Sequence, residues 1–227
     1  MKFVLGQMKK LFIFDWDGTL IDSADKIVGA MLAAISELEL ESRTDAEARN
    51  IIGLGLPEAV QHLYPELSEA GQQAMRAAYA RHFVAADQVP CALFPGALET
   101  LAELRDAGCL LAIATGKNRR GLTRVLGGLG LLDFFDATRC ADETRSKPHP
   151  QMLHELLAGF GLPAVSAVMV GDTEYDMAMA RNAGMDRIAV NYGAHAVERL
   201  LSYEPALVLE RLSQLVDWRA GGFEPAP

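Results

Sequence analysis

Asp15 and Asp17, two aspartates separated by one residue, directly follow the short apolar run from Leu11 to Phe14. The run is branched and aromatic, which predicts a buried strand, and open parallel sheets hold their ligands at the C-terminal ends of strands. Gly18 follows and permits a sharp turn. Two carboxylates on one face of the chain repel each other unless a proton or a divalent cation neutralises them. The pattern therefore suggests one carboxylate that attacks, and a neighbour that moves protons, beside a hard metal ion.

Two other interpretations of this motif remain open when it is taken alone. Asp and Gly favour turns, so Asp-x-Asp-Gly also occurs in surface turns. The same residues open calcium-binding loops, although the downstream acidic ligands of an EF-hand are missing from this sequence.

Two later segments place polar groups where they can bind an anion. Thr115 and Gly116 follow the apolar run 109–114 and precede a predicted helix, so a hydroxyl and backbone N–H groups meet there. The alternative is that Thr115 only caps that helix. Lys147 lies just before Pro148 and a second predicted helix. Such a lysine can neutralise paired carboxylates and bind a phosphate oxygen, or it can be solvated in a polar loop.

A last segment repeats the arrangement at the N-terminus. The predicted strand 164–170 ends in Gly171-Asp172, so Asp172 occupies the place that Asp15 occupies on the first strand. Asp176 follows in the first turn of the next predicted helix, where helix capping alone would also explain it.

Composition narrows the class of protein. The chain has 227 residues, 50% of them hydrophobic, and a formal net charge of -9. This acidic balance argues against nucleic-acid or anionic-membrane partners and does not exclude a small anionic substrate at a locally basic site. The three cysteines are widely spaced and odd in number, which favours reduced thiols in a cytoplasmic protein. No apolar segment is long enough for a membrane span or a secretory signal.

Helical and strand-like patterns are distributed unevenly along the chain. Residues 23–92 show helical periodicity only, and we expect a helical cap domain there. Residues 1–22 and 93–227 alternate between strands and helices, which predicts an α/β core with a doubly wound parallel sheet. The predicted core elements are helices 97–107, 119–129, 151–160 and 175–183 and strands 109–114, 135–140, 164–170 and 187–190. Residues 220–227 are expected to form a loose tail.

Taken together and in this order, the four segments resemble the haloacid-dehalogenase-like superfamily of phosphohydrolases, and the resemblance covers nearly the whole chain. DWDGTL, Thr115-Gly116, Lys147-Pro148 and GDTEYD match its four motifs. The helical insertion resembles a C1-type cap. The segments IIGLGLPEA, LFPGALETLAELR and KPHPQML place the chain nearest to phosphoglycolate phosphatases.

The resemblance implies a mechanism for the first two motifs. Asp15 resembles the nucleophile, which forms an aspartyl-phosphate, and Asp17 resembles the general acid/base. Mg²⁺ would be held by Asp15, Asp172 and the backbone carbonyl of Asp17. Thr19 would orient Asp17.

The remaining roles concern the phosphoryl group and the substrate. Thr115 and Gly116 would bind phosphoryl oxygens, and Lys147 would offset their charge. Asp176 would support Lys147 or the metal's water molecules. Arg49 is a candidate to contact the substrate, a small phosphorylated metabolite such as phosphoglycolate or a sugar phosphate, with a surface arginine as the equal alternative.

The presence or absence of particular residues also helps to choose among the activities known on this fold. Asp17 argues against dehalogenation, which needs no leaving-group acid, and the absence of lysine between Ile27 and Pro90 argues against a phosphonatase Schiff base. A β-phosphoglucomutase-like activity remains the alternative, although its cap lysine has no counterpart. The second alternative is a non-catalytic regulatory protein that binds metal on this fold. Trp16 and the Gly116-Lys117 pair depart from phosphoglycolate phosphatases, and the oligomeric state, monomer or dimer, stays open.

Overall fold

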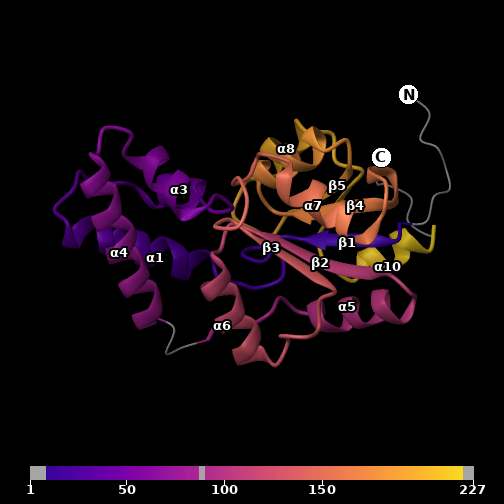
Figure 1. Ribbon diagram of the computed structural model, residues 1–227. Helices are drawn as coiled ribbons and strands as arrows, with labels where there is room; N and C mark the ends of the chain where they lie inside the picture. The colour runs from indigo at the N-terminus through magenta and orange to yellow at the C-terminus, as the bar shows by residue number, and fades with distance from the viewer. Residues whose placement is uncertain (1–8, 87–89, 222–227) are drawn as a thin grey trace.

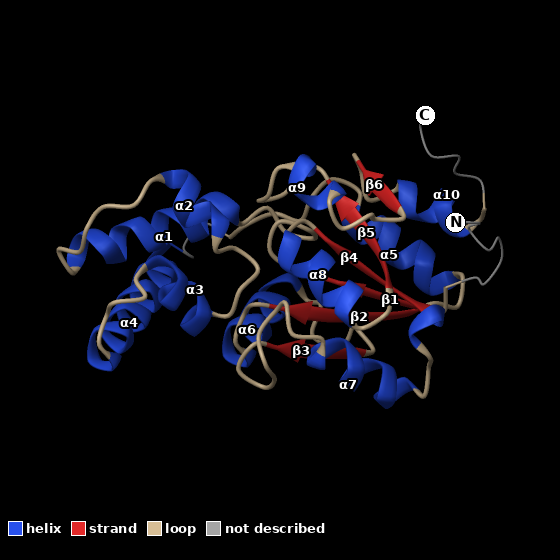
Figure 2. Ribbon diagram, turned by 90° about the horizontal axis from the view of Figure 1, so that it is seen from above, coloured by secondary structure: helices blue, strands red, loops and turns tan. Residues whose placement is uncertain are grey.

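The computed structural model describes residues 9–86 and 90–221. Its centre is a six-stranded sheet in which every neighbouring pair is parallel and the strand order is β3-β2-β1-β4-β5-β6 (Figure 2). The strands are β1 (Leu11–Phe14), β2 (Leu110–Thr115), β3 (Ala137–Cys140), β4 (Ala167–Gly171), β5 (Asp186–Val190) and β6 (Leu207–Leu209). Parallel neighbours need crossover connections, and the helices of the α/β part supply them.

Helices cover both faces of the sheet (Figure 1). Because side chains alternate along a strand, Phe12 and Phe14 of β1 belong to one apolar cluster and Leu11 and Ile13 to another. The first cluster includes side chains of α5 (Ala97–Asp106), α6 (Arg119–Leu129) and α10 (Gln214–Arg219). The second includes side chains of α7 (Gln151–Phe160) and α8 (Glu174–Asn182). The short α9 (Val197–Leu201) packs beside α8 and β5. The prediction of a doubly wound α/β fold is confirmed.

Four helices lie beside the sheet rather than on its faces (Figures 1 and 2). They are α1 (Ala24–Glu37), α2 (Asp45–Asn50), α3 (Leu56–Leu63) and α4 (Glu69–Ala86), and their apolar stripes form a separate cluster. Local signals account for their starts. Thr44 and Glu47 form a capping box at α2, and Pro57 occupies the first turn of α3. Within the described part of residues 23–92 no strand forms, as the periodicity predicts.

The structure differs from the predicted elements in the start of one strand and in three short elements near the C-terminus. The strand predicted from residue 164 begins at Ala167, because Ala164–Ser166 form a 3₁₀ turn. The elements β6, α9 and α10 were not predicted, since three to six residues are too few for a periodic pattern. Of the expected tail, residues 222–227 lie outside the described part. Among the described helices, none combines the length and the apolar character that crossing a bilayer requires.

Candidate active site

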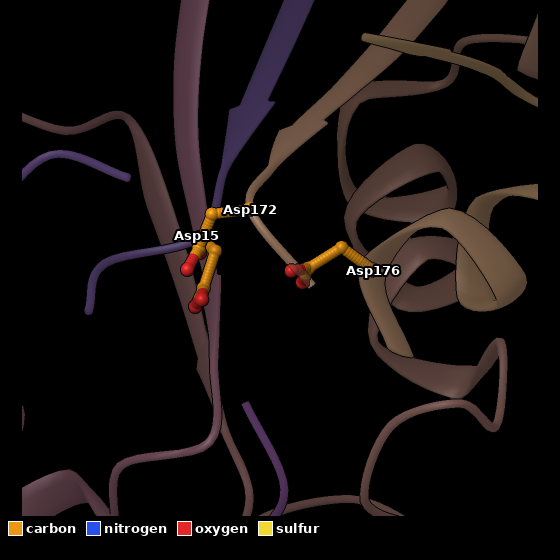
Figure 3. A group of neighbouring side chains, drawn as sticks. All are labelled: Asp15, Asp172 and Asp176. Carbon is orange, nitrogen blue, oxygen red and sulfur yellow. The ribbon is translucent and has the colours of Figure 1, made fainter. Parts of the chain in front are cut away.

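Two aspartates meet where the strand order changes direction. Phe14 of β1 is paired with Val170 of β4, so Asp15 and Asp172 leave neighbouring strands at the same edge of the sheet. This edge is the crevice in which doubly wound sheets bind ligands. Figure 3 shows the two carboxylates side by side, with the carboxylate of Asp176 directed toward them from α8. One oxygen from each of the three lies within 4.8 Å of the others.

Asp15 is buried with little to stabilise its charge. Its side chain is 1% exposed, and Lys147 Nζ lies 2.7 Å from Oδ1. Neither oxygen of Asp15 has a well-directed hydrogen-bond partner among the described residues. Burial raises the pKa of Asp15 well above its ordinary value, the charge of Lys147 opposes this, and the carboxylates of Asp176 and Asp172 add to it. Asp15 therefore lacks part of the positive or hydrogen-bonding environment that a buried carboxylate needs.

Lys147 links two of the carboxylates. Its Nζ lies 2.6 Å from Asp176 Oδ1 and its side chain is fully buried. Burial disfavours the ammonium charge, but the carboxylates of Asp15 and Asp176 outweigh it and raise the pKa of Lys147. The second oxygen of Asp176 accepts hydrogen bonds from the backbone N–H and hydroxyl of Thr173, at 3.0 and 2.7 Å. Both oxygens of Asp176 are thus engaged, and this residue holds Lys147 against Asp15.

Asp172 is oriented by two donors that come from distant loops. Thr19 Oγ1 donates to Oδ1 at 2.8 Å and the Ala194 N–H donates to Oδ2 at 2.7 Å. Burial and the nearby charge of Asp176 still raise the pKa of Asp172 to about 7. The expectation that Thr19 orients Asp17 is wrong, because the turn of the first motif directs this hydroxyl across the crevice to Asp172.

Two glycines allow the chain to pass this close to Asp172. Gly18 has a φ of 81°, and a Cβ at that position would lie 2.2 Å from Asp172 Oδ2. A Cβ at Gly193 would lie 2.1 Å from Asp172 Cβ. Gly193 and Ala194 lie just after β5, and this position at a strand end is the sequence signal that identifies them.

The donor set fits a hard divalent cation. Asp15, Asp172 and Asp176 bring three carboxylates against a single buried lysine, so the cluster carries a net charge of -2 when all three are ionised. Carboxylate oxygens are the ligands that Mg²⁺ prefers. Among the described residues, Asp15 pairs only with Lys147, and each oxygen of Asp172 accepts a single hydrogen bond. Asp176 is more fully engaged, because its Oδ1 pairs with Lys147 and its Oδ2 accepts two hydrogen bonds. Of the three carboxylates, those of Asp15 and Asp172 are the less fully engaged and could accept a cation.

Asp17 stands next to the cluster with its own partners. Ser23 Oγ donates to Asp17 Oδ1 at 2.5 Å, and Lys117 Nζ lies 3.0 Å from the same oxygen. Its side chain is 9% exposed and the residue lines a cavity, so a ligand can reach it. Ser23 and Lys117 are site residues that the motifs alone do not predict. For Lys117 the sequence does contain a signal, because this residue directly follows Gly116 of the second motif.

In the second motif, Thr115 does not cap the following helix, and Gly116 brings the backbone to the cavity. Asn118, and not Thr115, caps α6 by accepting the Gly121 N–H at 2.7 Å. Thr115 is buried at the end of β2 and accepts the Lys117 N–H at 3.1 Å. The capping alternative for Thr115 is thus excluded. Gly116 lines the cavity together with Asp15 and Asp17.

The segment that joins α2 to α3 is hydrogen-bonded to the α/β part of the chain. The carbonyl of Asn50 accepts hydrogen bonds from Tyr175 Oη at 3.0 Å and from His195 Nε2 at 3.1 Å. The Gly55 N–H donates to Ser146 Oγ at 2.8 Å. A Cβ at Gly116 would lie 2.5 Å from the carbonyl oxygen of Leu54 and 2.7 Å from that of Gly53. These contacts hold the turn directly over the second motif.

Arg49 does not lie where a substrate contact requires. Its guanidinium forms an ion pair with Asp25 at 2.6 Å, and it is not among the described residues that line the cavity. The surface-arginine alternative holds in this structure. Arg120 and Arg124 of α6 line the cavity instead.

The cavity above Asp15 and Asp17 has a volume of about 520 Å³. Its described lining comes from two sides, the strand ends with α6 and the helices α1, α3 and α4 with the turn between α2 and α3. Its size lies within the usual range for small-molecule sites.

Comparison with known proteins places this site in context. Residues 12–190 match the family model described as haloacid dehalogenase-like hydrolase. The chain is 36% identical over 215 residues to "Probable phosphatase IndB" of Dickeya dadantii, covering 92% of this chain and 93% of the relative. It is 29% identical to "Phosphoglycolate phosphatase" of Rhodospirillum rubrum, covering 93% and 91% of the two chains. The crystal structure of a predicted phosphoglycolate phosphatase from Haemophilus somnus shares the fold, with a TM-score of 0.84, 23% identity and coverage of 93% and 98%.

Proposed function

Since the chain belongs to the haloacid dehalogenase-like hydrolase family, among its phosphoglycolate-phosphatase-like members, and is a phosphatase, we propose that it hydrolyses a small phosphomonoester through an aspartyl-phosphate on Asp15, with Mg²⁺ as its cofactor. The observation that carries the proposal is the state of Asp15. Lys147 is the one described charge partner of its buried carboxylate, neither oxygen has a well-directed hydrogen bond in the described part of the chain, and the residue lines a cavity that Asp17 also lines.

The proposed reaction has two steps. An oxygen of Asp15 attacks the phosphorus, the bond to the ester oxygen breaks, and Asp17 gives its proton to the departing alkoxide. In the second step Asp17 takes a proton from water, the hydroxide attacks the same phosphorus, and phosphate leaves Asp15 as a free carboxylate. Ser23 and Lys117 hold Asp17 at the cavity for both transfers.

Charge neutralisation is the other requirement of phosphoryl transfer. Lys147 stabilises negative charge at Asp15 and at the phosphoryl group, and Asp176 fixes its position. Thr115 and the Gly116 N–H are proposed to bind phosphoryl oxygens. Mg²⁺, bound by Asp15, Asp172 and the Asp17 carbonyl, supplies the remaining positive charge.

We also propose that residues 23–92 form a mobile cap on a core of residues 1–22 and 93–227. The two connections support these boundaries, because they run side by side. The Asp22 N–H donates to the Ala92 carbonyl at 3.0 Å, and the Phe94 N–H donates to the Leu20 carbonyl at 3.0 Å. Paired connections of this kind allow the helical part to move as one body and to exclude water when closed.

Phosphate release from a panel of phosphomonoesters, phosphoglycolate and sugar phosphates included, tests the proposal. The assay is run with Mg²⁺ and with EDTA, using Asp15→Asn and Asp17→Asn beside the unchanged protein. We expect turnover that requires Mg²⁺, is abolished in Asp15→Asn and falls by at least about 10²-fold in Asp17→Asn. Absence of turnover from a folded protein that binds Mg²⁺ would refute hydrolysis and favour a mutase or a non-catalytic binder.

A further inference from the structure

The two walls of the cavity differ in chemistry. The described core wall contains Asp15 and Asp17 and carries every positive charge in the lining, on Lys117, Arg120 and Arg124. The described cap wall consists of apolar side chains and glycine, apart from one tyrosine. Its members are Ile27, Met31, Ile51, Ile52, Gly53, Leu54, Leu56, Ala59, Tyr79, Ala80, Phe83 and Val84. Residues 87–89 lie outside this comparison.

From this division we propose that the substrate is a phosphomonoester with an apolar leaving group, seated against the cap wall. The inference rests on the phosphatase activity proposed above and concerns only the alcohol that departs. The anionic phosphoryl end would lie on the charged core wall, and the body of the alcohol would lie among the side chains of α1, α3 and α4.

The cap wall offers almost nothing to a polar leaving group. Its one polar side-chain atom among the described residues is the hydroxyl of Tyr79, which has no hydrogen-bond partner in the described part of the chain. A carboxylate or several hydroxyls placed against this wall would lose water without gaining partners, which is unfavourable. An alkyl or aryl group would lose nothing and would bury apolar surface on both sides.

An aromatic patch forms the part of the wall that faces α6. The rings of Tyr79 and Phe83 lie 5.8 Å apart with a tilt of 32°. Lys117 Nζ lies 4.8 Å from the centre of the Phe83 ring while it is paired with Asp17. Lys117, the one lysine in the described lining, is therefore engaged on two sides and is a poor partner for a second anionic group on the substrate.

Cavity size points the same way. Phosphoglycolate has nine non-hydrogen atoms, and even at the roughly 30 Å³ that one water molecule occupies in the liquid they would fill about 270 Å³. The cavity holds about 520 Å³. The cavity therefore has room for an alcohol larger than glycolate.

A series of n-alkyl phosphates from ethyl to hexyl tests the proposal, because the reactivity of the ester scarcely changes along it. We expect kcat/KM to rise about fourfold for each added methylene, the factor for transferring one CH₂ out of water. We also expect hexyl phosphate to exceed phosphoglycolate and glycerol phosphate. A flat or falling series, or a preference for phosphoglycolate, overturns the inference and leaves the phosphatase intact. No release from any ester overturns the phosphatase proposal itself.

A matched pair of substitutions locates the effect. Val84 lines the cavity and Val165 lies on the core surface, and each is 55% exposed, so Asp is tolerated at both. We expect Val84→Asp to lower the hexyl-to-ethyl ratio of kcat/KM about tenfold and Val165→Asp to leave the ratio unchanged. Equal ratios in the two variants, with both shown to be folded by circular dichroism, would place the apolar site elsewhere and overturn the assignment.

Discussion

Asp172→Asn tests whether the buried acidic cluster is a metal site. Burial and the charge of Asp176 raise the pKa of Asp172 from 3.8 to about 7. Between these two values the folded protein holds a proton that the unfolded chain has lost. Stability of the metal-free protein therefore falls as the pH rises through this window. For one group with these two pKa values, the loss between pH 5 and pH 7.5 is about 2 to 3 kcal/mol.

The substitution removes this titration, since an amide carries no charge. From pH 5 to pH 7.5 in EDTA, the unchanged protein should therefore lose about 2 to 3 kcal/mol more of its free energy of unfolding than Asp172→Asn loses. Urea unfolding at the two pH values measures it. Asp22→Asn, which changes an exposed carboxylate nearby, serves as the control. Adding Mg²⁺ at pH 7.5 should raise the melting temperature of the unchanged protein and of the control, but not of Asp172→Asn.

Two results would refute this reasoning. Parallel pH dependence of the two proteins in EDTA would mean that Asp172 ionises near its ordinary value despite its burial. An equal rise in melting temperature with Mg²⁺ in Asp172→Asn would mean that the cation is held by other groups. The first result concerns the electrostatics of the cluster and the second concerns the ligand set.

Three further substitutions test separate parts of the site. Lys147→Met leaves two buried carboxylates without their shared cation, and we expect a loss of about 3 to 5 kcal/mol by urea unfolding in EDTA, whereas an unchanged midpoint would contradict the buried pairing. Gly116→Ala places a Cβ 2.5 Å from the Leu54 carbonyl oxygen, and steady-state kinetics should show kcat/KM lowered about 10²-fold by displacement of the cap. Tyr175→Phe removes one hydrogen bond to Asn50, worth about 0.5 to 1.5 kcal/mol, so KM should rise about two- to tenfold with kcat nearly constant.

The charged half of the site follows from the sequence to a large extent. Apolar runs that end in Asp15 and Asp172 predict strand ends, and parallel strands bring such ends to one edge. The same logic applied after β5 would have pointed to Ala194, whose N–H binds Asp172. The partner of Thr19 was not predictable, because the choice between Asp17 and Asp172 depends on a hydrogen bond between residues 153 positions apart. Local spacing favours Asp17, the carboxylate nearer in sequence. It carries no information about the turn that directs the Thr19 hydroxyl to Asp172.

The apolar half is hidden from the sequence for a different reason. Ile27 and Met31 recur at helical spacing and predict a face that packs against other helices. Both belong to the apolar cluster of α1–α4, and both also line the cavity. Periodicity identifies which face of a helix avoids water. It does not distinguish a face covered by protein from one that a ligand completes.

This distinction explains why four motifs predict the chemistry of the site and not its substrate. Asp15, Asp17 and Gly116 line the core wall, and on the proposed mechanism the motif residues bind any phosphoryl group in the same way. The turn over the second motif is held through the Asn50 carbonyl and the Gly55 N–H, so its attachment depends on backbone and says little about the side chains that it carries. On the same proposal, selectivity lies with the cavity-lining side chains of α1, α3 and α4, whose only polar member on the described wall is Tyr79. Differences in substrate among proteins with the same motifs should therefore follow the polarity of this wall rather than the residues that perform the reaction.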